Sequence, residues 1–433
     1  MIIYSETITA RLRYIGDFIG KEISKGPLTF TNNKDEFSRY SGIKISYSPR
    51  SICPDQFWIQ PHNLLFETGI KEQEAGCFEW NGSKAFFKTN GDLPFDIFAA
   101  SFYLLSRYEE YLPHTKDMYG RYAHVNSIAY RENFLNIPLV NKWLDMLRNL
   151  LKQKFPVSTI SHSPFTFLPT YDIDEAWSFK HKQWWRTMGA VLKDLLSGRT
   201  RNYSLRRKVL NDRASDPYDS YAWMDELHEE YKLKPRYFFL VAGKTKTYDK
   251  NTPPNGNAFQ ELIRQHAAKY MIGLHPSWQS GDDPLLISKE KETVEKAAGI
   301  SVVSSRQHYI RFTLPQTFRY LVDAGIKEDF SMGYGSINGF RASVASPFFW
   351  YDLEKEWSTS LLLYPFCYME ANSFFEQKLS SWQALDEMAY YYNEVKKVNG
   401  TFITIWHNTF LGTSARFNGW RDVYRQFIKE ISA

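Results

Sequence analysis

Cysteine is scarce in this chain of 433 residues, and its three cysteines are too few for a disulfide framework and lack the spacing of a zinc site. Long apolar runs are also absent, since no stretch approaches the roughly 18 apolar residues of a membrane-spanning helix. Polar side chains interrupt the first 20 residues, which therefore lack the apolar segment of a secretory signal. We therefore expect a cytoplasmic protein.

A strong excess of one charge is missing as well. The 53 Lys and Arg residues exceed the 48 Asp and Glu residues by five, which is too little to indicate a nucleic-acid partner. Residues 180–213 are the exception, with ten Lys or Arg and two Asp. Within them, residues 183–197 place apolar side chains, including Trp184 and Trp185, on one helical face. Two interpretations remain: a peripheral contact with an anionic membrane, or an inserted helix packed on its domain, which we prefer.

The composition is that of a globular protein, with 43% hydrophobic, 23% charged and 17% aromatic residues. The first 90 residues show the short apolar segments of strands, separated by turn residues. Two helical patterns follow, one capped by Asp96 and one at about 140–154. Because a Pro- and Ser-rich stretch follows, we predict a smaller N-terminal α+β domain over residues 1–160 and a second domain over 161–433.

The second domain alternates between strand and helix patterns, which predicts an α/β fold with a parallel sheet, either a barrel or a doubly wound sheet. Strands are expected at 165–173, 236–243, 270–277, 300–310, 360–369 and 401–408. Helices are expected at 218–231, 257–269, 286–297, 315–324 and 380–397.

Asp172 and Asp174 stand at the end of the first of these strands. Residues two apart in a strand point to the same side, so the two carboxylates project together. They repel one another unless a cation lies between them, which is the arrangement of a general base beside a metal ligand. The alternative is a pair of surface carboxylates that caps the next helix.

Histidines stand at two further strand ends. An apolar strand runs into His275, and a β-branched strand ends at His407. A single histidine is more often a packed core residue than a ligand. The carboxyl ends of parallel strands, however, meet at one edge of the sheet, where sites of this fold class lie. We therefore expect Asp172, Asp174, His275 and His407 to share one pocket.

Several segments, in this order, carry a family resemblance. TYDID (170–174), GLHPSWQS (273–280) and TIWHN (404–408) resemble the first, second and last motifs of polysaccharide deacetylases of carbohydrate esterase family 4. The stretches at 304–312 and 329–353 are similar to those of a subgroup of that family. LPFDIFAASFYLLSRYEEYLP (93–113) resembles a domain of unknown function that precedes this subgroup. The resemblance implies a distorted parallel (β/α) barrel of the NodB type over residues 161–433.

The resemblance also implies roles for single residues in a metal-assisted deacylation. Asp174 and His275 would bind the metal, and Asp172 would be the general base. Either Arg306 or Arg341 would pair with Asp172. His407 would be the general acid for the leaving group.

One position departs from the family pattern. The second motif normally supplies two histidines four residues apart, but Gln279 occupies the second position here, and an amide is a poor ligand for zinc. We predict that His308 completes the site for a divalent metal, with zinc as the first choice. His308 could instead pack or bind substrate, and the site could lack a metal altogether. Substrate contacts are assigned to Trp278, Gln279, Tyr309 and Tyr334.

The expected function is a metal-dependent hydrolase that removes an acetyl group from a sugar or glycan precursor, soluble or lipid-linked, in surface-polysaccharide metabolism. Two alternatives stay open. One is an inactive carbohydrate-binding protein on the same barrel, and the other is an amide hydrolase for a small non-sugar substrate.

Overall fold

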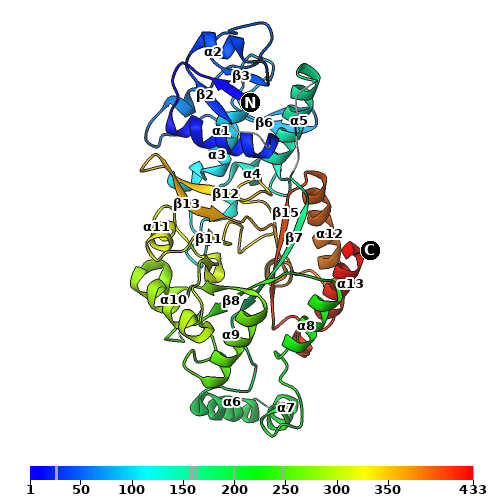
Figure 1. Cartoon of the computed structure of the whole chain (residues 1–433). Helices are drawn as coiled ribbons and strands as arrows, with labels where there is room; N and C mark the ends of the chain where they lie inside the picture. Colours follow the sequence, from blue (N-terminus) through cyan, green and yellow to red (C-terminus); the bar gives the residue numbers. More distant parts are fainter. Residues whose placement is uncertain (25–27, 157–159, 161–162, 198–199, 246–247, 433) are drawn as a thin grey trace.

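The protein is elongated, with the N-terminal strands at one end and helices α6 and α7 at the other (Figure 1). The computed structural model describes residues 1–24, 28–156, 160, 163–197, 200–245 and 248–432. The predicted domain boundary between residues 160 and 161 falls beside residues 157–159 and 161–162, which lie outside this described part.

The N-terminal part contains a parallel sheet of four strands in the order β2-β1-β3-β4 and a separate antiparallel pair, β5 and β6. Its strands are β1 (Ile2–Tyr4), β2 (Thr29–Thr31), β3 (Lys44–Tyr47), β4 (Phe57–Ile59), β5 (Phe78–Trp80) and β6 (Ser83–Ala85). Its helices are α1 (Ala10–Ile23), α2 (Lys34–Arg39), α3 (Ile97–Leu105), α4 (Ile128–Arg131) and α5 (Leu139–Lys154).

Helix α1 corrects the sequence prediction, which assigned only strands and turns to the first 90 residues. The apolar face of α1 is buried, and Thr9 caps its first turn by accepting a hydrogen bond from the Leu12 amide. The pattern is hard to recognise because polar Arg11 and Glu22 are also buried in this helix. Arg11 pairs with Glu356 of the second part, and a partner so distant in the sequence cannot be predicted from local patterns.

The second part is built on a nine-stranded sheet in the order β12-β13-β11-β10-β9-β8-β7-β15-β14. All neighbours are parallel except β12 and β13. The strands are β7 (Thr166–Ile173), β8 (Arg236–Leu240), β9 (Met271–His275), β10 (Ser304–Ser305), β11 (Glu328–Asp329), β12 (Phe348–Asp352), β13 (Trp357–Leu363), β14 (Tyr368–Met369) and β15 (Thr401–His407). The helices that pack around them are α8 (Tyr221–Glu230), α9 (Asn257–Lys269), α10 (Pro284–Ala298), α11 (Gln316–Asp323), α12 (Ser381–Lys397) and α13 (Trp420–Ser432).

This sheet is open, which corrects the prediction of a barrel. Among the described strands, β12 and β14 form the two edges and are not paired with each other. The strand predicted at 360–369 is divided between the end of β13 and the short β14, with Pro365, which has no amide hydrogen to donate, between them. The strand predicted at 300–310 is reduced to Ser304–Ser305, since the backbone adopts positive φ at Tyr309 and Ile310.

The two parts share one hydrophobic core, which runs from the N-terminal helices into the large sheet. The hydroxyl of Tyr14 in α1 donates to the carbonyl oxygen of Phe349 in β12 at 2.7 Å. Buried Glu110 accepts hydrogen bonds from Arg107 of its own part and from Arg341 of the second part. The N-terminal part is therefore joined to the sheet through both apolar and ionic contacts.

Helices α6 (Trp184–Leu196) and α7 (Thr200–Leu210) project from the body of the protein (Figure 1). Trp184 is 78% exposed, Trp185 is 56% exposed and Leu192 is 58% exposed. The preferred prediction that this apolar face packs against its own domain is therefore wrong. Among the helices that the structure describes, none is both long and apolar enough to cross a membrane.

Candidate functional site

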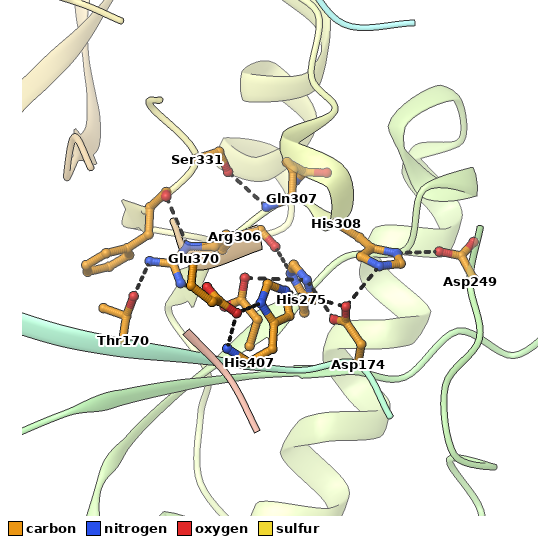
Figure 2. Close-up of polar contacts among 12 residues, drawn as sticks. Thr170, Asp174, Asp249, His275, Arg306, Gln307, His308, Ser331, Glu370 and His407 are labelled. Atoms are coloured by element: carbon orange, nitrogen blue, oxygen red, sulfur yellow. Dashed lines mark hydrogen bonds and ion pairs between the residues drawn. The ribbon is translucent and has the colours of Figure 1, made fainter. Parts of the chain in front are cut away.

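Asp172, Asp174, His275 and His407 meet at the carboxyl ends of β7, β9 and β15, and Figure 2 labels the last three of these residues. His407 lies opposite Asp172 in the ladder between β15 and β7. Together with Asp174, His275 and His308 they line one cavity of about 600 Å³. The parallel register explains this convergence, because it brings polar residues that follow separate apolar strands to the same edge.

Asp174, His275 and His308 form a cluster with the geometry of a metal site. The Nε2 atom of His275 is 3.2 Å from one oxygen of Asp174, and the Nε2 atom of His308 is 3.4 Å from the other. One ligand atom from each residue lies within 4.8 Å of the other two. The Oδ1 atom of Asp174 is buried without a hydrogen-bond partner in the described part of the chain. Such an unsatisfied carboxylate oxygen is what a bound cation would satisfy.

The hydrogen bonds of both histidines fix the tautomer that a metal ligand needs. The Nδ1 atom of His275 donates to the carbonyl oxygen of Arg306, and the Nδ1 atom of His308 donates to the carboxylate of Asp249 at 2.8 Å. Because these oxygens only accept, each Nδ1 carries a proton, and each unprotonated Nε2 could present its lone pair to a cation beside Asp174.

The negative charge of Asp174 and the positive charge of His308 stabilise each other. Desolvation alone would raise the pKa of Asp174, but His308, His275 and His407 hold it well below its ordinary value. Desolvation alone would lower the pKa of His308, but Asp174 and Asp249 raise it to about 9. In the absence of a metal, His308 thus carries the positive charge that compensates Asp174, and a divalent cation would replace its Nε2 proton.

Asp172 is held by a fully buried arginine. Arg306 donates from Nη1 to Asp172 at 2.7 Å, from Nη2 to Thr170 at 2.7 Å and from Nε to the Phe330 carbonyl at 3.1 Å. The other carboxylate oxygen of Asp172 lies 3.7 Å from Nε2 of His275. One oxygen is therefore fixed by the arginine while the second faces the cluster.

Arg341, the other arginine proposed as a partner of Asp172, is placed elsewhere. Its guanidinium binds Glu110 at 2.6 and 2.8 Å and the carbonyl oxygen of Gly333 at 3.1 Å. Arg306 takes the position beside Asp172 because β10 lies next to β9, which carries His275. Arg341 has a structural position between the two parts of the chain.

His407 has a buried carboxylate partner that the sequence prediction missed. Glu370 accepts hydrogen bonds from the His407 amide at 2.8 Å and from its Nδ1 at 2.6 Å. Desolvation would lower the pKa of His407, but Glu370, Asp174 and Asp172 raise it to about 10. Glu370 directly follows β14. The expectation that polar residues at strand ends share one site, which predicted His407, would have predicted Glu370 as well.

Three of the four predicted substrate contacts are not among the described residues that line the cavity. Gln279 and Trp278 bind Asp249 instead, through the Gln279 amide at 2.9 Å and the Trp278 backbone N–H at 2.8 Å. Tyr334 is buried, and Arg341 lies over its ring. Only Tyr309 lines the cavity.

The cavity wall combines aromatic rings with charged side chains, and it includes residues from the N-terminal part. Tyr119 packs on Tyr309 at 5.0 Å between ring centroids, and Arg121 donates to the Tyr309 carbonyl at 3.0 Å. The other aromatic residues of the wall are Tyr218, Tyr248, Phe375, Phe410 and Phe417. The site is therefore completed by both parts of the chain.

Comparison with known proteins gives a family for the N-terminal part only. Residues 1–156 match DUF7033, a family of unknown function. No curated protein matches the chain.

Among solved structures, the chain is similar to a protein from Mycobacterium smegmatis that is provisionally described as a polysaccharide deacetylase. That similarity covers 63% of this chain and 85% of the other, with 16% identity and a TM-score of 0.40. A Puue allantoinase is similar over 61% of this chain and 84% of its own, with 11% identity and a TM-score of 0.38. A mutant of a family CE4 pseudoenzyme with restored activity is similar over 62% and 65%, with 10% identity and a TM-score of 0.30. At such low values, no residue role or substrate is carried over from these proteins.

Proposed function

We propose that the protein is a metal-dependent hydrolase that removes an acetyl group from a sugar or glycan precursor. The observation that carries the proposal is the cluster of Asp174, His275 and His308, with Asp172 and His407 beside it. Three protein ligands next to a general acid and a general base are the parts of a hydrolytic metal site.

The residues present fit a divalent metal, with zinc as the first choice. Two imidazole nitrogens and one carboxylate oxygen form a ligand set that zinc takes in catalytic sites. Each imidazole has its other nitrogen fixed by a second residue, as metal-bound histidines do. When bound, the ion would supply a Lewis acid for an acyl carbonyl and would make water easier to deprotonate.

The protein side chains would carry the protons. The oxygen of Asp172 that faces the cluster would accept a proton from the attacking water, while Arg306 holds the other oxygen in place. His407, protonated at neutral pH because of its raised pKa, would donate its Nε2 proton to the leaving nitrogen or oxygen as the bond to the acyl carbon breaks. The products are acetate and the free amine or alcohol of the sugar.

The cavity walls support a polar ring substrate. Aromatic side chains offer flat apolar faces, and the cavity is large enough for a small sugar. We propose a soluble or lipid-linked acetylated precursor as the substrate. The assay below distinguishes a leaving nitrogen, from an N-acetyl group, from a leaving oxygen, from an O-acetyl group.

The test is a measurement of acetate release together with metal content. We expect the purified protein to bind about one zinc ion, to release acetate from a panel of acetylated sugars, and to lose activity on chelation. Asp172→Asn should lower kcat by about 10²–10⁴-fold with the metal retained. A matched control is Glu230→Gln, which changes an exposed carboxylate of α8 that is not among the lining residues of the cavity and should leave activity near that of the wild type.

Two results would contradict the proposal. A protein that binds sugars without a metal and without acetate release would be the inactive carbohydrate-binding protein. Hydrolysis of cyclic amides without action on acetylated sugars would indicate an amide hydrolase for small non-sugar substrates.

A further inference from the structure

The hairpin formed by α6 and α7 presents an unpartnered apolar stripe. Trp184, Met188, Leu192 and Leu196 follow one another at intervals of four residues, and Trp185 lies beside them. All five side chains are exposed, with Trp184 and Leu196 the most exposed. Exposed apolar side chains that lie next to one another mark a surface that contacts another protein or a membrane.

The opposite side of α6 is the one that packs within the protein. Asp194 is buried and accepts hydrogen bonds from Arg206 of α7 at 3.1 and 3.3 Å. Arg206 in turn lies over the ring of Phe179 at 4.5 Å, which joins α7 to the base of the hairpin. The apolar stripe is therefore exposed, while the other face of α6 holds the hairpin together.

The segment that carries this stripe has an excess of positive charge. Residues 180–213 carry ten Lys or Arg and only two Asp, and both Asp are ion-paired, Asp194 with Arg206 and Asp212 with Lys180. Five cations of the segment are exposed and take part in no ion pair within the described part of the chain: Lys193, Arg201, Arg207, Lys208 and Arg213. Exposed tryptophans beside unpaired cations are typical of helices that lie in the interface of an anionic membrane.

We propose that the hairpin of α6 and α7 is a peripheral membrane anchor, which inserts the apolar stripe into a lipid surface of negative charge. Two partners could cover such a stripe, a second copy of the chain or a lipid surface, and charge complementarity favours the lipid surface. A second copy of the chain would bring two segments of net charge +8 together, whereas anionic headgroups would neutralise them. The helix lies on the membrane and does not cross it.

The hairpin is held at a fixed place relative to the cavity. The carboxylate of Asp216 accepts the backbone N–H groups of residues 178–180 at 2.7, 2.8 and 3.0 Å, which closes the base of the hairpin. Lys182 binds Glu175 at 2.7 Å, and both Glu175 and Tyr218 line the cavity. Anchoring would therefore bring the rim of the cavity toward the lipid surface, although membrane binding itself does not depend on the proposed reaction.

The test is co-sedimentation of the full chain with vesicles of phosphatidylcholine that contain about one third phosphatidylserine, compared with phosphatidylcholine alone. We expect binding to the anionic vesicles at low salt and partial release at high salt. The double substitution Trp184→Ser with Trp185→Ser should weaken binding by at least about tenfold, and Arg207→Glu with Lys208→Glu should do the same. The matched control is Trp382→Ser, because Trp382 is 63% exposed, between Trp185 and Trp184, but lies on α12.

These variants change exposed side chains, so their circular dichroism and thermal midpoint should stay as in the wild type. The proposal is overturned if the wild type binds anionic vesicles no better than neutral ones, or if the tryptophan pair can be replaced without loss of binding. It is also overturned if the wild type is a dimer in sedimentation equilibrium and the tryptophan variant a monomer, since the stripe would then join two copies.

Discussion

The side chain of Gln279 is hydrogen-bonded to Asp249, with Nε2 donating to Oδ2 at 2.9 Å. The other oxygen of this carboxylate accepts from Nδ1 of His308. The residue that stands at the sequence position of a second metal-binding histidine thus acts one step away from the proposed metal site. It helps to hold the carboxylate that orients His308.

Metal content should therefore respond differently at these positions. His308→Ala removes one of three ligands and should reduce bound zinc to a small fraction. Asp249→Ala should weaken zinc affinity by about 10–100-fold, because it releases the tautomer and orientation of His308. Gln279→Ala should have a smaller effect than either. The measurement is metal analysis after dialysis, with competitive chelator titration. Loss of zinc in Gln279→Ala together with its retention in His308→Ala would reverse the assignment.

Glu370→Gln should change the pH dependence of hydrolysis. Glu370 is the strongest of the groups that raise the pKa of His407 to about 10, so a neutral amide lets this pKa fall. Since the proposed general acid must be protonated, activity should then be lost at a lower pH on the alkaline side. The measurement is kcat against pH, with Glu230→Gln, outside the cavity lining, as the control. An unchanged alkaline limb would show that His407 is not the acid.

Arg306→Lys should separate positioning from metal binding. Lysine keeps the charge but cannot bind Asp172, Thr170 and the Phe330 carbonyl at the same time. We expect kcat to fall by about 100-fold or more while zinc content stays near that of the wild type. The hydrogen bond from His275 goes to the backbone carbonyl of Arg306, which the substitution leaves in place. If zinc content falls together with kcat, Arg306 is needed for metal binding as well, and the separate positioning role is contradicted.

Glu110→Gln should destabilise the whole protein. It leaves Arg107 and Arg341 buried without their shared carboxylate, which costs about 3–5 kcal/mol in the free energy of unfolding. Glu79→Gln, which breaks an ion pair in which Glu79 is largely exposed, should lower the free energy of unfolding far less. Urea titrations of the two variants provide the comparison. An equal loss of unfolding free energy in the two variants would contradict a large stabilising role for Glu110.

The same residue predicts a sensitivity to acid. Burial would raise the pKa of Glu110, but Arg341 and Arg107 hold it at about 2, below the ordinary value of 4.5. The ionised form is therefore favoured in the folded chain, and this stabilisation is complete above pH 4.5 and is lost as the pH falls toward 2. It amounts to about 3 kcal/mol. Unfolding of the wild type should depend more steeply on pH in this range than unfolding of Glu110→Gln.

Local patterns predicted the central elements well. The strands β7, β9 and β15 are mainly apolar segments with polar residues at or just beyond their carboxyl ends, and the structure places them within two residues of the prediction. Helix α12 begins where Ser380 and Gln383 form a capping box. In contrast, the strand order and the open edges of the sheet depend on the pairing of very short strands, such as β10 with β9 and β14 with β15, which no local pattern specifies.

The site could be predicted where it lies at strand ends. Asp172, Asp174, His275 and His407 were expected to meet, and the structure brings them into one cavity. Asp249 was missed because it lies in the irregular segment between β8 and α9, where sequence periodicity gives no direction to a side chain. The choice between Arg306 and Arg341 likewise depended on tertiary placement.

The shared contacts of Glu110 have a consequence for how such chains can diverge. Glu110 belongs to the segment that matches DUF7033, and Arg341 belongs to the part that carries the site. Tyr119 and Arg121 of the first segment also form part of the cavity wall. Fusing the large sheet to an unrelated N-terminal segment would leave a buried cation uncompensated and the cavity incomplete. The two parts should therefore be inherited and duplicated together, and recombination between them should be rare among descendants that keep a working site.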